Sequence, residues 1–244
     1  SIDFQGLEDA MAKGTIKLFL LCSPANPVGR VWTQEELRQL GDLCNRYGVL
    51  VVADEIHADF VWGDHKHHVY PSLGPDYANN CILCTAPSKT FNIAGLQISN
   101  IFIPNPDSRA RFKSAVTAAG YSQANAMGIF ACQAAYQTGA QWLDEVKAYI
   151  WDNILYTKAY LEEHLPQLKM YVPQGTYLVW IDCSALPMTA EEREQWLWHD
   201  AKLWLDSGAI FGPDGKDFER INVACPRSVL HGGLEQLRRA VEAL

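Results

Sequence analysis

Several kinds of sequence feature are missing from this chain of 244 residues. No apolar run approaches the roughly 20 residues that a membrane-spanning helix needs. The first ten residues, SIDFQGLEDA, contain neither a basic segment nor an apolar signal core. The formal net charge of −8 is spread along the chain without a block of like charges. We therefore expect a cytoplasmic protein that binds neither a membrane nor nucleic acid.

Motifs for metals and nucleotides are missing as well. The seven cysteines are scattered and odd in number, which suits a reducing compartment better than a disulfide framework. Cys81 and Cys84 have redox or zinc-ligand spacing, but no second pair or suitably spaced histidine follows. The HKHH cluster at 65–68 matches no standard ligand set, and we interpret it as a polar loop. Without G-x-G-x-x-G or a P-loop, a nucleotide-binding fold has little support.

The first half of the chain has the pattern of a parallel crossover unit. TIKLFLLC, residues 15–22, predicts a buried strand, and GVLVVADE, residues 48–55, predicts a second one. Between them, TQEE at 33–36 is a capping-box pattern that begins an amphipathic helix. Strand, helix and strand in this order are typical of a parallel sheet.

The rest of the chain predicts a second, smaller domain. Strands are expected near Cys81 and over 98–104, followed by mainly helical sequence to about residue 165 with breaks near Gly120 and Gly139. After residue 166 we expect two strands, a helix rich in tryptophan (Trp196, Trp198 and Trp204), a strand at FERINVACP and a closing helix. The fold class is α/β. We predict a large domain over 1–140 with a mostly parallel sheet and helices on both faces, a connecting helix over 141–165, and a small α+β domain over 166–244.

Two polar side chains lie at or just beyond predicted strand ends. Lys89, in APSKTF, follows the strand near Cys81, and ligands bind at such ends in open α/β sheets. Most loop lysines are only surface charges, whereas a desolvated lysine here would be a nucleophile or Schiff-base former. Asp54 closes an apolar strand, and a buried carboxylate needs a partner such as a protonated ring nitrogen.

Two further polar residues have both a structural and a functional interpretation. Asn26 precedes a proline in ANPVG, which is common in turns. Arg220 lies within an apolar strand, where its forked guanidinium suits a carboxylate ligand. A structural ion pair would give the same pattern, so neither residue is decisive alone.

Five ordered segments together carry a specific resemblance: NPVGRVWTQEEL, ADEIHADFVW, APSKTFNIAGLQ, AAYQTGAQWLDEV and RINVACPRS. With these segments the chain resembles the C-terminal part of a fold-type I pyridoxal-phosphate enzyme of the class I/II aminotransferase superfamily. Within that superfamily it is most similar to the MalY/PatB-type cystathionine β-lyases. The resemblance spans most of the sequence.

The resemblance implies a role for each candidate residue. Lys89 would bind the cofactor, pyridoxal 5'-phosphate, covalently and then act as the acid and base at the substrate's α-carbon. Asp54 would keep the pyridine nitrogen protonated, and Asn26 would hydrogen-bond the phenolic oxygen. Ser88 would contact the phosphate, and Arg220 would hold the substrate's α-carboxylate.

His57 stands where many aminotransferases have a tyrosine near the phenolic oxygen, and a histidine at this position resembles the lyase subgroup. A histidine bonded for purely structural reasons is an equally good interpretation. Two positions depart from the aminotransferase pattern: Gln97 replaces a phosphate-binding arginine, and Ala86 replaces a serine. The family's N-terminal region has no counterpart here, so we expect a C-terminal fragment of an enzyme that is a homodimer at full length.

The resemblance predicts a carbon–sulfur β-lyase that acts on a small sulfur-containing amino acid such as cystathionine and yields a thiol, pyruvate and ammonia. The first alternative is an aminotransferase that uses the same Lys89, Asp54 and Arg220. The second alternative is a non-catalytic fragment or interaction module.

Overall fold

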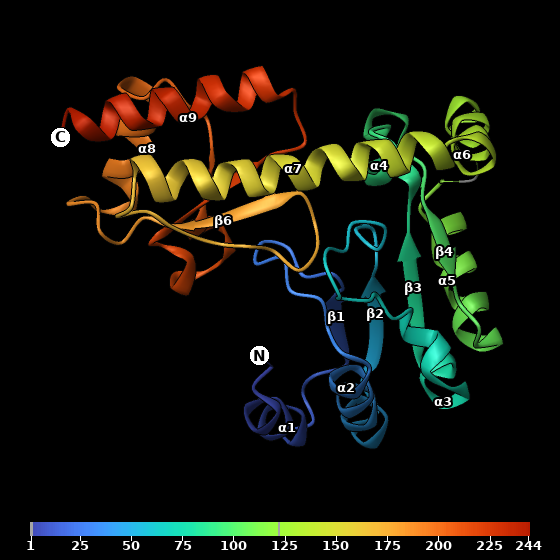
Figure 1. Ribbon diagram of the computed structural model, residues 1–244. Coiled ribbons are helices and arrows are strands. Elements are labelled where there is room, and N and C mark those ends of the chain that lie inside the picture. Colours follow the sequence, from blue (N-terminus) through green and yellow to red (C-terminus); the bar gives the residue numbers. More distant parts are fainter. Residues whose placement is uncertain (1, 122) are drawn as a thin grey trace. The chain divides into compact units, whose positions relative to one another are not determined.

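The computed structural model describes residues 2–121 and 123–244, and its chain divides into two compact units (Figure 1). Unit 1 comprises Ser1–Ala25 and Val31–Leu143. Unit 2 comprises Asn26–Arg30 and Asp144–Leu244. The chain thus places a five-residue segment of its first half in the second unit.

Unit 1 is built on a four-stranded sheet in the order β1-β2-β3-β4. The strands β1 (Leu18–Cys22), β2 (Leu50–Asp54) and β3 (Cys81–Thr85) are parallel, and β4 (Asn100–Phe102) pairs antiparallel with β3. The α/β class and the predicted strand–helix–strand unit are confirmed. Because three parallel strands end together, the loops that follow them meet at one edge of the sheet.

The crossover helix α2 (Gln34–Tyr47) begins as its sequence predicts. Thr33 and Glu36 form a reciprocal capping box, and Gly48 ends the helix in the left-handed conformation with φ of 64°. Leu37, Leu40 and Cys44 are completely buried against the sheet. The helix α1 (Phe4–Ala12) joins the same core through Met11.

The other face of β1 is open. Leu20 is 73% exposed and Leu18 is 45% exposed, whereas Leu21 faces the core and is 3% exposed. Side chains alternate between the two faces of a strand, so every second residue of β1 points away from α1 and α2. The prediction that this strand is buried is therefore correct for one face only.

The remaining elements of unit 1 are helical. They are η1 (Tyr70–Leu73), α3 (Pro75–Asn79), α4 (Pro87–Thr90), η2 (Ala94–Leu96), α5 (Pro106–Ala118), α6 (Ala126–Thr138) and the start of α7 (Ala140–His164). The helices α5 and α6 end next to Gly120 and Gly139, where breaks are predicted. Met127 and Phe130 on α6 are 67% and 69% exposed.

Unit 2 contains an antiparallel sheet in the order β5-β6-β8-β7. Its strands are β5 (Lys169–Tyr171), β6 (Leu178–Asp182), β7 (Asp206–Ser207) and β8 (Phe218–Asn222). Its further elements are α8 (Ala190–His199), η3 (Gly208–Phe211), η4 (Pro213–Gly215) and α9 (Arg227–Glu242). Trp204 lies outside α8 and is 88% exposed, so its assignment to that helix is wrong.

The closing helix α9 and the second part of α7 lie side by side in unit 2 (Figure 1). Tyr156 and His231 are joined by a hydrogen bond of 2.7 Å, and Tyr160 donates to Glu235. Leu230, Leu234 and Leu237 on α9 are buried. The three-part domain division remains a prediction, because α7 belongs to both units.

Within the described ranges, we find no helix that combines the length and the apolar character needed to span a bilayer.

Candidate functional site

The predicted unit 1 residues gather around the carboxyl ends of the parallel strands. Asp54, the last residue of β2, lies in register between Cys22 of β1 and Cys84 of β3. Its backbone oxygen accepts the N–H of Ser23 at 2.9 Å, and the next N–H, of Glu55, donates to the Cys84 carbonyl at 2.9 Å. The backbone at Asp54 is therefore fixed from both neighbouring strands.

The Asp54 side chain differs from its sequence prediction in one respect. It is exposed, and one carboxylate oxygen accepts the N–H of Ile56 at 3.2 Å. The argument that a buried charge requires a partner thus does not hold for this residue. What the structure does provide is an accessible carboxylate at the sheet edge, and no ion pair involves it among the described residues.

Lys89 lies in the short helix α4, directly beyond the end of β3, as predicted. Ser88 is half-buried and its carbonyl accepts the N–H of Ile93 at 3.0 Å, which closes the turn behind the lysine. The Lys89 side chain is exposed, so the expected desolvation is not observed.

An aromatic cluster anchors the turn that carries Lys89. The Phe91 ring stacks on Trp142 with 5.9 Å between centroids and meets the edge of Tyr136 at 6.0 Å. The chain passes the Phe91 ring closely at Gly139, where a Cβ atom would lie 2.5 Å from that ring. A larger residue at position 139 would clash with the Phe91 ring and with the backbone oxygen of Ala135, which lies equally close.

A second anchor of the same turn is a side-chain hydrogen bond. The Thr90 hydroxyl donates to the Asp59 carboxylate at 2.6 Å, and Thr90 is 2% exposed. This bond connects the residue after Lys89 to the loop that follows Asp54. Sequence reasoning missed it, because neither residue type at these positions signals a contact 31 residues apart.

His57 lies in the loop after β2 and is 5% exposed. Nearby, Glu55 is buried with two partners: the N–H of Tyr70 at 2.7 Å and the ring of His67 at 2.7 Å. The HKHH segment is a loop, as interpreted, but the side chain of His67 is only 10% exposed and faces Glu55. The pair of Glu55 and His67 joins the two ends of this loop. The role of His57 toward a ligand stays a prediction.

The two departures from the family pattern lie close to the lysine in sequence. Ala86 is buried and precedes α4, and Gln97 is exposed with φ of 51° after η2. Neither side chain can supply a positive charge. The only hydroxyl directly adjacent to Lys89 on its N-terminal side is that of Ser88.

The predicted unit 2 residues are in direct contact. Arg220 on β8 donates through Nη1 to the side-chain oxygen of Asn26 at 2.7 Å. It also donates to Oδ2 of Asp206 through Nη2 at 2.6 Å and through Nε at 3.2 Å. Sequence reasoning paired Arg220 with a ligand carboxylate or a structural ion pair, and the structure shows an ion pair with Asp206.

Asn26 is held in unit 2 by the turn that follows it. Gly29 has φ of 65°, and its carbonyl accepts the N–H groups of Gln174 at 2.8 Å and Gly175 at 2.9 Å. A Cβ atom on Gly29 would lie 2.5 Å from the Cβ of Pro173, so only glycine fits here. Arg30 adds a hydrogen bond of 2.8 Å to the Gln174 side chain.

A buried ion pair lies one residue away from Arg220. Arg193 of α8 donates to Glu219 at 2.7 Å, and the two side chains are 2% and 3% exposed. Burial raises the pKa of the Glu219 carboxyl, while the hydrogen bond from Arg193 acts in the opposite direction. Arg193 also donates to the carbonyl of Lys216, which fixes the start of β8.

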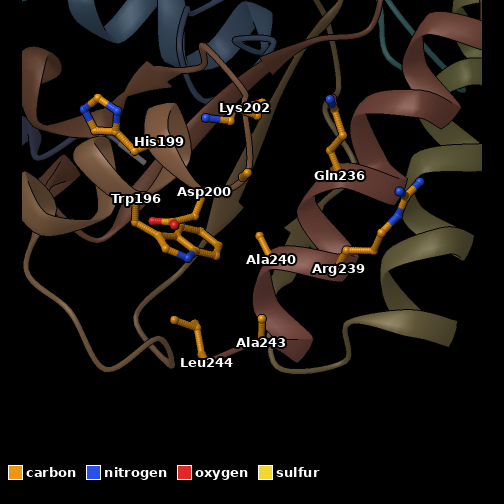
Figure 2. A pocket seen from close by; sticks show the side chains of 10 residues that line it. Trp196, His199, Asp200, Lys202, Gln236, Arg239, Ala240, Ala243 and Leu244 are labelled. Carbon is orange, nitrogen blue, oxygen red and sulfur yellow. The ribbon is translucent and has the colours of Figure 1, made fainter.

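A hollow of about 650 Å³ lies elsewhere in unit 2, between the C-terminal ends of α8 and α9. It contains none of the predicted site residues. In Figure 2 the imidazole of His199 and the guanidinium of Arg239 point away from each other, so these two basic side chains do not converge. Helix C-termini also present carbonyl oxygens, which disfavour an anion.

None of the seven cysteines forms a disulfide. Burial raises the pKa of Cys81 to about 12 and that of Cys183 to about 12. Within the part of the chain that the structure describes, no group of three or more potential ligands is placed to hold a metal ion.

The family model for aminotransferases of class I and II matches residues 1–244. The chain belongs to this family. It is 42% identical over 241 residues to the cystathionine β-lyase PatB of Bacillus subtilis and 38% identical over 244 residues to the protein MalY of Escherichia coli. Each alignment covers 99% of this chain and 62% of the relative.

Solved structures of this family are also similar to the chain. Cystalysin from Treponema denticola, which contains a pyridoxal 5'-phosphate cofactor, matches with a TM-score of 0.97 and 40% identity. The match covers all of this chain and 62% of that protein. The chain thus spans about 62% of the length of the relatives that it matches, and the predicted superfamily and lyase-like subgroup are confirmed.

Proposed function

We propose that this chain carries the cofactor lysine and the substrate-binding arginine of a pyridoxal-phosphate-dependent carbon–sulfur β-lyase. The observation that carries the proposal is the placement of Asp54 at the end of β2 and of Lys89 in the helix just beyond the neighbouring parallel strand β3. An amine and a carboxylate that are both accessible at one sheet edge suit a ligand with an aldehyde and a basic ring nitrogen.

The described residues fit most, but not all, of this cofactor. The Lys89 amine can bind an aldehyde, and the Asp54 carboxylate can hold a proton on a pyridine nitrogen. Asn26, whose side-chain oxygen accepts from Arg220, would hydrogen-bond the phenolic oxygen, as the family resemblance implies. The phosphate finds Ser88 but no cation at positions 86 and 97, so further donors must come from other groups.

The cofactor supplies an electron sink that acidifies the α-C–H bond of an attached amino acid and lets a β-substituent leave. The residues of this chain do the rest. Arg220 binds the α-carboxylate of the substrate, and Asp54 stabilises the proton on the ring nitrogen. Lys89 would accept the α-proton and pass it to the departing sulfur, which leaves as the thiol, and water would convert the remaining three-carbon unit into pyruvate and ammonia.

The substrate that we propose is a small sulfur-containing amino acid such as cystathionine, with a thiol, pyruvate and ammonia as products. The name of the relative PatB, a cystathionine β-lyase, supports the lyase over other chemistries. We also propose that the enzyme acts in the cytoplasm as a homodimer. Seven cysteines without a disulfide support a reducing compartment. The exposed apolar side chains of Met127 and Phe130 on α6 support a surface that another subunit covers.

An aminotransferase is the second candidate, because the matching family model describes aminotransferases and because Lys89, Asp54 and Arg220 would serve either reaction. The two reactions differ in where the proton goes. In transamination Lys89 would deliver it to the cofactor side, and a keto acid would be needed as acceptor.

Product analysis of this chain supplied with pyridoxal 5'-phosphate tests the proposal. We expect pyruvate and thiol from L-cystathionine without any keto acid, and complete loss of this activity in Lys89→Ala. Lys113→Ala, which removes an exposed lysine from α5, serves as the matched control and should keep full activity. Amino transfer that requires a keto acid would favour the aminotransferase. Absence of both reactions would leave a non-catalytic module.

A further inference from the structure

Arg220 is fixed by a second residue whose role the family resemblance does not predict. Asp206 of β7 lies directly opposite Arg220 of β8 in the antiparallel register, so the two side chains share one face of the sheet. We propose that Asp206 is a positioning residue, which sets the plane of the Arg220 guanidinium so that it can receive the substrate carboxylate. This inference rests on the proposed function.

The hydrogen-bond pattern shows what Asp206 leaves available. A guanidinium has five N–H donors. Oδ2 of Asp206 takes the Nε–H and one N–H of Nη2, and Asn26 takes one N–H of Nη1. Two donors remain, one on each terminal nitrogen. On this proposal the substrate carboxylate accepts from these two nitrogens, as carboxylates do from an arginine fork.

Asp206 supplies most of the contacts that fix the orientation of the Arg220 guanidinium. Its Cζ lies 4.8 Å from the centroid of the Phe211 ring, a contact that restrains one face of the guanidinium. Rotation in the guanidinium plane is not restrained by a ring face. Two hydrogen bonds to one carboxylate oxygen and a third to Asn26 do restrain it, and two of these three come from Asp206.

A purely electrostatic role of Asp206 predicts the opposite sign. The Arg220 side chain is 15% exposed and that of Asp206 is 46% exposed. If Asp206 acted only through its charge, removing it would leave the positive charge of Arg220 uncompensated and would strengthen the binding of an anion. If Asp206 acts by positioning, removing it weakens that binding. The direction of the change therefore separates the two roles.

The experiment is a titration of the isotope-labelled chain with L-alanine and, separately, with L-alaninamide, followed through the guanidinium NMR signal of Arg220. The signal is assigned by its loss in Arg220→Lys. Because the readout is binding at the arginine, it requires neither cofactor nor turnover. We expect the wild-type signal to respond to L-alanine and not to L-alaninamide, which lacks the carboxylate.

In Asp206→Asn we expect the affinity for L-alanine to fall about tenfold, as for the loss of one charge-assisted restraint. Asp214→Asn removes the same charge from the exposed η4 segment and should leave the affinity unchanged. Asp206→Glu keeps the charge but moves the carboxylate, so positioning predicts a loss in this variant too. It also serves as the second variant if Asp206→Asn disturbs the fold.

Three results would overturn the inference: unchanged or tighter binding in both Asp206 variants, an equal loss in Asp214→Asn, or no response of wild-type Arg220 to L-alanine. In the loaded enzyme, the inference further expects KM to rise in Asp206→Asn while kcat stays unchanged. A failure of the proposed function looks different, since Lys89 would then bind no cofactor while Arg220 still responded to the amino acid.

Discussion

The two groups of candidate residues are held in place by different means. In unit 1, Asp54 and Lys89 are exposed, and their positions come from the backbone at the ends of two parallel strands. In unit 2, Arg220 is held through its side chain by Asp206 and Asn26, next to the buried pair of Arg193 and Glu219. A backbone-placed group tolerates changes in neighbouring side chains, whereas a side-chain-placed group depends on each partner.

The sheets of the two units also differ in how completely their strands are buried. One face of β1 in unit 1 is open, with Leu20 73% exposed, whereas β6 of unit 2 has four buried residues in a row. The two units also bury different kinds of charged pair. Unit 2 buries a full ion pair between Arg193 and Glu219, and unit 1 buries the Glu55 carboxylate against His67.

The largest effect should come from breaking the ion pair of unit 2. Arg193→Met leaves the Glu219 carboxylate buried without its cation, which typically costs about 3–5 kcal/mol. We expect this loss in the free energy of unfolding, measured by urea denaturation, together with faster amide hydrogen exchange in β8. Arg239→Met, an exposed arginine on α9, is the control and should change stability by less than about 0.5 kcal/mol. Equal effects of both variants would contradict the side-chain account of unit 2.

A smaller effect is expected at the Lys89 turn of unit 1. Thr90→Val removes the hydroxyl that donates to Asp59 at 2.6 Å and keeps the shape of the side chain. Because Asp59 is exposed, the expected cost is about 1.5 kcal/mol, at the low end for a bond to a charged group. Hydrogen exchange at Phe91 and Ile93 should speed up, and Thr90→Ser should restore the slow rate. A global loss as large as that of Arg193→Met would remove the contrast between the units.

The smallest effect is a pH dependence from a buried thiol of unit 2. Burial raises the pKa of Cys183 to about 12, against roughly 8.5 in an unfolded chain. The folded state therefore keeps a proton that the unfolded state loses. This contribution to stability is complete below about pH 8.5 and is lost as the pH rises toward 12. At pH 9 the loss is below about 1 kcal/mol. Urea midpoints at pH 7.5 and pH 9 should show it in the wild type and show less of it in Cys183→Ala.

The sequence predicts much of unit 1 because its determinants are local. The capping box at Thr33, the apolar run of β2 and the prolines and glycines of the loops all act within a few residues. Placing Asp54 and Lys89 at strand ends needed no knowledge of distant contacts. The predicted burial of Asp54 and Lys89 was wrong, because the exposure of a side chain at a strand end depends on what covers the sheet and not on the strand itself.

The contacts of unit 2 could not be predicted in the same way. Arg220 and Asn26 are 194 residues apart, and Arg193 and Glu219 are 26 residues apart on different elements. Their pairing follows from the register of β8 with β6 and β7 and from the packing of α8. An arginine in an apolar strand signals that some acceptor is near, but it does not tell which aspartate. The pair of Glu55 and His67 could not be predicted for the same reason, because the HKHH segment does not tell which carboxylate one of its histidines contacts.

The most direct test of the central claim is to mix the chain with pyridoxal 5'-phosphate, reduce it with borohydride and locate the added mass by peptide mapping. We predict selective labelling of Lys89, which Lys89→Ala abolishes and Lys113→Ala leaves unchanged. Labelling spread over surface lysines such as Lys113, or no labelling, would contradict the claim that the strand ends of unit 1 form a cofactor site.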